Sequence, residues 1–274
     1  SPERYKSLGV DVMLGSAVIK SPWEVSVDGE IKTTRSIVIA AGASPFVPNI
    51  PGIKEINPMT SDTLWKMESL PRDLTVVGGG PIGCELALAL ARLGSKVTLL
   101  EGLNSIINTE DEEVSEFVSS VLKEEGVEVL TGHMVKSFGV DSKSGKKEIT
   151  CAKGDSPVKV LSDEIIVAFG RSARTTGYGL EDLGVRLNKN GTIAANGYLQ
   201  TNYKNIYVVG DVTGPLQFTH FAAHQAGFAA INSLLRPFVR LKANYRVIPF
   251  TIFVDPEVAR VGLNEKEAKS KNIS

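Results

Sequence analysis

The stretch Leu74-Thr75-Val76-Val77-Gly78-Gly79-Gly80-Pro81-Ile82-Gly83-Cys84-Glu85 decides the fold of this chain. A short apolar run leads into Gly78-x-Gly80-x-x-Gly83, and a helical pattern opens directly after it. Gly78 permits a tight turn, Gly80 lets the backbone approach a pyrophosphate, and Gly83 lets helix and strand pack closely. The helix N-terminus offers unpaired N–H groups and positive dipole to phosphates. The stretch predicts a dinucleotide-binding turn; the alternative is a glycine turn without a ligand.

The residues that follow complete a βαβ unit. A helix over 81–93 leads to an apolar strand over 96–101, and Glu101 lies 23 positions after Gly78, close to the ~20 expected for a ribose-binding acid. Helical spacing over 110–125 puts Val114, Phe117, Val118, Val121 and Leu122 on one face. Strands are expected over 127–130 and 164–170, with short antiparallel strands over 134–161. Strands alternating with helices predict a parallel sheet.

The flanking regions have simpler patterns. Apolar and polar residues alternate around an Asp28–Gly29 pair, which predicts a hairpin. A proline-rich stretch over 45–58 is typical of a crossing segment between domains. A strand is expected over 206–211, a helix over 220–235 and a strand over 249–254, with a helical start at Asn264.

Composition excludes several classes of protein. The 274 residues suggest two domains. A formal net charge of −1 argues against a nucleic-acid binder. No apolar run approaches the ~18 residues of a membrane span, and no signal segment is visible. Ser1 opens a sequence that reads like the interior of a longer one, so we expect a fragment.

Few other side chains suggest chemistry. Cys84 and Cys151 form no dithiol motif, and their scarcity favours a reducing compartment such as the cytoplasm. His220 and His224 have metal-ligand spacing, but no third ligand or general base accompanies them, so no metal is expected. Glu85 lies one turn into the helix, where a nicotinamide would project; a solvated helix residue is the alternative.

The chain resembles the flavin-dependent pyridine nucleotide–disulfide oxidoreductases, the group that includes lipoamide dehydrogenase and mercuric reductase. Five segments occur in family order and support this resemblance. They are Ile37–Ala43, Gly78–Glu85, Ala168–Arg171, Ile206–Asp211 and Phe253–Gly262. The residues Gly214-Pro215 and Phe218–Ala223 are most similar to the mercuric-reductase-like branch.

The resemblance implies an α/β fold with two Rossmann-like, three-layer domains that have β-meander insertions. Residues 1–54 and 171–244 would form a partial FAD-binding domain, 55–170 an NAD(P)-binding domain, and 245–274 the start of a dimerisation domain. The intact protein would be a homodimeric, cytoplasmic enzyme of cell redox homeostasis. No nucleic-acid partner and no membrane span are expected.

The resemblance also implies roles for individual residues. Asp211 would bond the ribitol of FAD, Thr219 and His220 would lie under the flavin ring, Ala17 would meet the adenine end, and Gly42 would pass close to that cofactor. A second set would hold NAD. It comprises Gly78, Gly79, Gly80, Pro81, Ile82 and Glu101, with Met134 and Gly170 on the adenosine side and Gly83 completing the glycine motif.

Two departures limit the functional prediction. The family's first GxGxxG and its Cys-x4-Cys redox pair are not found in this sequence, so we expect that residues 1–274 hold FAD weakly or not at all and carry no dithiol chemistry. The expected activity is hydride transfer from NAD(P)H to FAD and on to a disulfide or metal-ion substrate. Open alternatives are a dithiol-free flavin NADH dehydrogenase or ferredoxin reductase, and a non-catalytic NADH sensor. Glu101, without a nearby Arg or Lys for a 2′-phosphate, predicts NADH over NADPH.

Overall fold

The computed structural model describes residues 1–273 and divides the chain into two compact units. The first unit comprises Ser1–Ser44 and Ser172–Tyr245. The second comprises Pro45–Arg171 and the C-terminal residues from Arg246. Strands β5 (Ala43–Pro45) and β13 (Arg171–Ala173) contain two of the points where the chain passes from one unit to the other.

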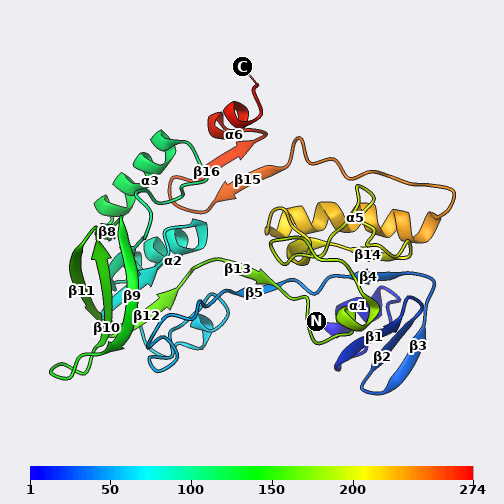
Figure 1. Ribbon diagram of the computed structural model, residues 1–274, viewed down its shortest axis with the longest axis horizontal. Coiled ribbons are helices and arrows are strands. Elements are labelled where there is room, and N and C mark those ends of the chain that lie inside the picture. Colours follow the sequence, from blue (N-terminus) through cyan, green and yellow to red (C-terminus); the bar gives the residue numbers. More distant parts are fainter. Residues whose placement is uncertain (274) are drawn as a thin grey trace. The chain divides into compact units, whose positions relative to one another are not determined.

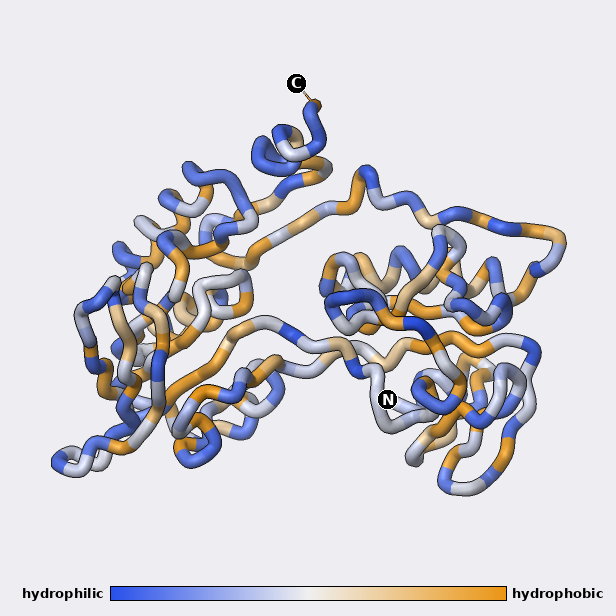
Figure 2. Tube along the Cα trace, in the orientation of Figure 1, coloured by the Kyte–Doolittle hydropathy of each residue, from blue (hydrophilic) through white to orange (hydrophobic). Residues whose placement is uncertain are grey.

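A parallel sheet of four strands, in the order β12-β6-β7-β8, forms the centre of the second unit (Figure 1). The strands are β6 (Asp73–Val77), β7 (Lys96–Leu100), β8 (Glu128–Leu130) and β12 (Glu164–Val167). Residues Val76 and Leu99 are at most 1% exposed, as expected of a parallel sheet that is covered on both faces. In Figure 2 strand β12 is coloured as a hydrophobic run.

Two helices and a meander cover the faces of this sheet. Helix α2 (Pro81–Arg92) packs on β6 and β7, and α3 (Glu112–Glu124) packs beside β8. On the other face lies an antiparallel sheet, whose Phe138, Ile149 and Cys151 share a core with Val77 and Leu100. Its strands are β9 (His133–Val140), β10 (Lys147–Lys153) and β11 (Ser156–Ser162). Helices, parallel sheet and meander form three layers, as the family resemblance implied.

Two segments outside the expected boundaries of the NAD(P)-binding domain belong to the second unit. The proline-rich stretch before residue 55 packs here because Ile53 is 2% exposed in the core next to Phe138. The C-terminal residues form β15 (Pro249–Ile252), β16 (Val258–Val261) and α6 (Glu265–Ser270). The 3₁₀ helix η1 (Leu64–Lys66) completes the unit.

The first unit combines a meander with a two-stranded parallel sheet. Strands β1 (Ala17–Ser21), β2 (Glu24–Val27) and β3 (Glu30–Thr33) form the meander, and β4 (Ile37–Ile39) pairs in parallel with β14 (Ile206–Val208). Helix α5 (Thr219–Leu235) packs against both β4 and β14. The remaining elements are α1 (Pro2–Ser7), α4 (Leu180–Leu183) and the 3₁₀ helix η2 (Gly210–Val212).

The Asp28–Gly29 hairpin is confirmed. Both residues have positive φ, 47° and 91°, and they connect the paired residues Val27 and Glu30. Positive φ at both central positions is the geometry that favours an Asp-Gly pair in a two-residue turn.

Some local predictions are wrong. Phe117 was expected on the buried face of α3, but 46% of it is exposed, and only Ser115, Val118 and Leu122 of this helix are buried. The buried face of α3 is therefore narrower than the helical spacing predicts. The strand expected over 206–211 ends at Val208, because Gly210 adopts a φ of +76° and opens η2.

Candidate functional site

The turn between β6 and α2 has the geometry that its glycines predict. Gly78 has a φ of +114°, which a side chain would strain, and its N–H donates to the carbonyl of Leu100 on the adjacent strand (2.8 Å). A Cβ at Gly83 would lie 1.8 Å from the carbonyl oxygen of Gly78. The first turn of α2 therefore packs directly on the backbone that leaves β6.

The N-terminus of α2 opens into free space. Gly80 is the N-cap residue, and a Cβ built there would meet nothing within 4 Å. Pro81 occupies the first helical position, which is favourable because an N–H there would have no helical partner. The amides of Ile82 and Gly83, also in the first turn, have no carbonyl partner within the helix. This arrangement suits a phosphate group.

Glu101 lies beside this turn at the carboxyl end of β7. Its Oε2 accepts a hydrogen bond from the Gly79 N–H (2.6 Å), and its Oε1 accepts one from the Leu103 N–H (2.7 Å). Two backbone N–H groups therefore hold this carboxylate in one orientation. Because a Cβ at Gly79 would lie 3.1 Å from Oε2, glycine is needed there for this approach.

A groove of about 570 Å³ runs along the carboxyl ends of these strands. Parallel α/β sheets bind ligands at this edge. Seven residues of the predicted NAD set line the groove: Gly78, Gly80, Pro81, Ile82, Glu101, Met134 and Gly170. Gly79 and Gly83 of that set are not among its lining residues. Further lining residues, which the sequence did not assign to this site, include Leu103, Asn108, Thr109 and Phe169.

Glu85 does not line this groove. Its Oε1 accepts a hydrogen bond from the Phe253 N–H (2.9 Å), and burial raises the pKa of its carboxyl although this bond opposes the rise. Its proposed place beside a nicotinamide stays a prediction.

A second set of predicted residues lies in the first unit. Ala17 lines a cavity of about 860 Å³ together with Ile39, Ala40 and Tyr178. Gly42 has a φ of +69°, and a Cβ there would meet nothing within 4 Å. The cavity and the open glycine leave room for a large cofactor.

Three further residues of the predicted FAD-binding set follow strand β14 or begin helix α5. Asp211 belongs to η2, which follows β14, and Thr219 is the first residue of α5. The ring of His220 stacks on that of Phe218 with 5.5 Å between ring centroids. A helix N-terminus favours negative charge nearby, as the predicted role under a flavin requires.

The cysteines and histidines form no reactive cluster. Cys84 and Cys151 are free and buried; burial raises the pKa of each thiol. His224 contacts the backbone carbonyl of Asn244 (2.9 Å). Among residues 1–273, no group of three His, Cys, Asp or Glu side chains could hold a metal ion.

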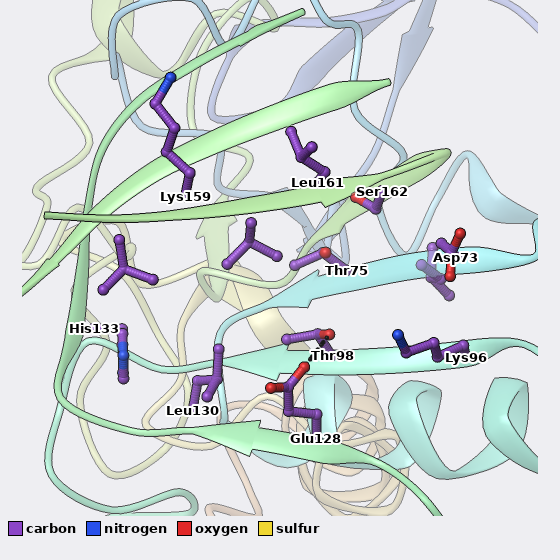
Figure 3. A pocket seen from close by; sticks show the side chains of 13 residues that line it. Asp73, Thr75, Lys96, Thr98, Glu128, Leu130, His133, Lys159, Leu161 and Ser162 are labelled. Carbon is purple, nitrogen blue, oxygen red and sulfur yellow. Dashed lines mark hydrogen bonds between the residues drawn. The ribbon is translucent and has the colours of Figure 1, made fainter. Parts of the chain in front are cut away.

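A separate cavity of about 310 Å³ lies between β11 and the starts of β6 and β7 (Figure 3). Its lining residues include Thr75 and Ser162, both 1% exposed, whose buried hydroxyls have no hydrogen-bond partner among the described residues. The cavity lies at the amino-terminal half of the strands, away from the glycine turn. It is therefore not the groove in which a dinucleotide would bind.

The chain belongs to the pyridine nucleotide–disulphide oxidoreductase family, whose model matches residues 4–226. The fold and the glycine turn agree with this family. Similar proteins include a mercuric reductase of Staphylococcus aureus, 36% identical over 98% of this chain and 49% of that protein. A dihydrolipoyl dehydrogenase of Mycoplasma pneumoniae is 34% identical over 97% of this chain and 57% of that protein.

Solved structures agree with this assignment. The HOCl-induced flavoprotein disulfide reductase RclA from Escherichia coli has a TM-score of 0.86 and 27% identity, covering 98% of this chain and 61% of that one. The chain spans about half the length of the curated relatives that it matches. Within the part of the chain that the structure describes, no helix is long and apolar enough to cross a membrane.

Proposed function

We propose that this chain is part of an FAD-dependent NAD(P)H oxidoreductase that acts on a disulfide or metal-ion substrate. The groove at the β6–α2 turn, which combines close-packed glycines, a free helix N-terminus and a fixed carboxylate, is the observation on which the proposal depends. Family membership and the named relatives support the same activity. When bound, NAD(P)H would supply a hydride and FAD would accept it.

In this proposal the second unit binds and orients the nicotinamide cofactor. Gly78, Gly79, Gly80, Pro81 and Ile82 would hold the pyrophosphate, because the space beside Gly80 at the N-terminus of α2 is open. Two of the groove-lining residues, Met134 and Gly170, would flank the adenosine. Glu85 would contact the nicotinamide end, as the sequence predicts.

The first unit would hold FAD. Ala17 and Gly42 border open space that suits an adenine moiety. Asp211 would accept hydrogen bonds from the ribitol. The N-terminus of α5, at Thr219 and His220, would stabilise negative charge on the reduced isoalloxazine. The test is to add FAD and NADH anaerobically to the full-length protein and follow the visible flavin absorbance; bleaching supports the proposal, and unchanged absorbance of bound flavin contradicts it.

We further propose that Glu101 selects NADH over NADPH. Its carboxylate is fixed at the end of β7 by two backbone N–H groups, where it would accept bonds from both ribose hydroxyls. A 2′-phosphate there would bring like charges together, at a cost of several kcal/mol, so a preference of roughly 10- to 100-fold or more follows. Comparing NADH and NADPH affinities of the wild type and Glu101→Ala tests this; an unchanged preference contradicts the assignment.

We also propose a homodimer and a reducing, cytoplasmic location for the intact protein. The two free, buried cysteines are consistent with such a compartment, and homodimers are the family expectation. Light scattering of the purified full-length protein tests the first proposal, and cell fractionation tests the second.

A further inference from the structure

One wall of the nucleotide groove is a loop that follows β7. Leu103, Asn108 and Thr109 of this loop line the groove. The loop continues to Asp111, the residue before α3. Its outer side contacts the C-terminal segment, defined here as residues 246–273, which lies in the same compact unit.

Three consecutive carbonyls of the loop accept hydrogen bonds from side chains of the C-terminal segment. The Asn264 Nδ2 donates to the Thr109 carbonyl (2.7 Å). The Lys266 ammonium donates to the carbonyls of Asn108 (3.3 Å) and Glu110. The C-terminal segment therefore donates hydrogen bonds to the backbone of two groove-lining residues, Asn108 and Thr109.

Asp111 makes a second connection. It is the N-cap residue of α3, yet its carboxylate makes no capping bond to that helix. The carboxylate instead accepts the N–H groups of Glu265 (3.1 Å) and Lys266 (3.2 Å) in the first turn of α6. The loop end and the start of α6 are thus joined through two backbone donors.

A buried ion pair forms the third connection. Arg260 Nε donates to Glu110 Oε2 (2.7 Å), and the Glu110 side chain is only 2% exposed. The same guanidinium lies 4.9 Å from the centroid of the Phe250 ring and donates to the carbonyl of Gly262. Glu110 therefore depends on Arg260 for its neutralisation.

The same loop also contacts the glycine turn directly. The Ile107 N–H donates to the carbonyl of Gly79 (2.7 Å), and both Ile106 and Ile107 are 1% exposed. The methyl Cγ2 of Ile106 would lie 2.7 Å from a Cβ at Gly79. A displacement of Thr109 or Glu110 would therefore also displace Ile107, and with it the Gly79 backbone of the predicted pyrophosphate turn.

We propose that Arg260, Asn264 and Lys266 are positioning residues for the nicotinamide cofactor, and that the C-terminal segment is part of its binding site. The inference rests on the proposed function of the groove. Residues 55–170 alone would therefore bind NADH more weakly than the full chain, because that piece lacks the side-chain donors of Asn264 and Lys266 to residues 108–110.

Two substitutions in the full chain test this proposal. Asn264→Asp keeps the side-chain oxygen that caps α6 at Glu267 and removes the donor to Thr109. Lys266→Met removes the two bonds to Asn108 and Glu110. We expect the Kd for NADH, measured by calorimetry, to rise about three- to tenfold in each, the effect of losing one or two hydrogen bonds. Lys269→Ala is the matched control, because the ion pair of Lys269 among residues 1–273 is with Glu265 of its own helix.

Hydrogen exchange at the Ile107 amide separates positioning from general destabilisation. We expect faster exchange there in Asn264→Asp and Lys266→Met, with the amides of central strand β6 unchanged. Wild-type NADH affinity and wild-type Ile107 exchange in both folded variants would overturn the inference. Failure of the proposed function has a different result, in which the wild-type chain itself does not bind NADH.

Discussion

The close approach at Gly83 gives a sharp test of how the glycine turn is built. Replacement by alanine would place a Cβ 1.8 Å from the Gly78 carbonyl oxygen, whereas real Cβ contacts are essentially never under 3.0 Å. The clash is with backbone atoms of Gly78 and not with a side chain. Helix α2 or the end of β6 must therefore move by more than 1 Å, and no flexible side chain can absorb the shift.

The expected cost of Gly83→Ala lies at the upper end of what overpacking a core causes, about 3 kcal/mol. For a unit of this size that corresponds to a fall in Tm of roughly 6–12 °C. Thermal unfolding followed by circular dichroism measures the change. NADH affinity should fall too, because the displaced helix N-terminus is the proposed phosphate site.

Gly139→Ala is the matched control. Gly139 lies within β9 of the same unit, its φ is not in the left-handed region, and a Cβ there would meet nothing within 4 Å. The control should be neutral or slightly stabilising, because alanine loses less conformational entropy on folding. If Gly83→Ala retains the wild-type Tm and Gly139→Ala does not, the reasoning about helix–strand contact is refuted.

Three further outcomes are expected. Thr75→Val should leave the free energy of unfolding unchanged or raise it by up to about 1 kcal/mol, because a buried hydroxyl without a partner is unfavourable; urea denaturation that shows a loss of that size would mean the hydroxyl is bonded. Burial raises the pKa of Glu85 above its ordinary 4.5, so the folded state favours the protonated acid and stability contributed by this group is lost as pH rises above 4.5. Glu85→Gln keeps an acceptor for the Phe253 N–H and should reduce the fall in stability as pH rises above 4.5, as measured by urea unfolding at a series of pH values; an unchanged slope would assign the dependence to other groups. The thiols of Cys84 and Cys151 should resist iodoacetamide in the native chain and react in urea, because burial raises both pKa values; mass spectrometry that finds native alkylation would contradict their burial.

The sequence predicted the parts of the fold that depend on local pattern. The glycine spacing located the β6–α2 turn, and the position of Glu101 after β7 placed its carboxylate beside that turn. Asp28–Gly29 located a hairpin because only certain residues accept positive φ at both positions. In each case the prediction rests on residue types that a particular local structure requires.

The parts that the sequence did not reveal depend on contacts between distant residues. Asn108 and Thr109 line the groove only because the loop folds back along the ends of the strands, and neither residue type signals this. The bond from Asn264 to Thr109 joins residues 155 positions apart. Strand β16 was also missed, since its alternation is short and its partner β15 provides most of the evidence for it.

Binding of NADH to the full chain decides whether the β6–α2 turn is a dinucleotide site. Calorimetric titration of the wild type should show one saturable site, and Gly80→Val should abolish it while keeping the wild-type Tm within a few degrees, because the space at Gly80 is open to a side chain but would be occupied by the pyrophosphate. Equal NADH affinity in the wild type and a folded Gly80→Val variant, or no binding by the wild type, would contradict the account.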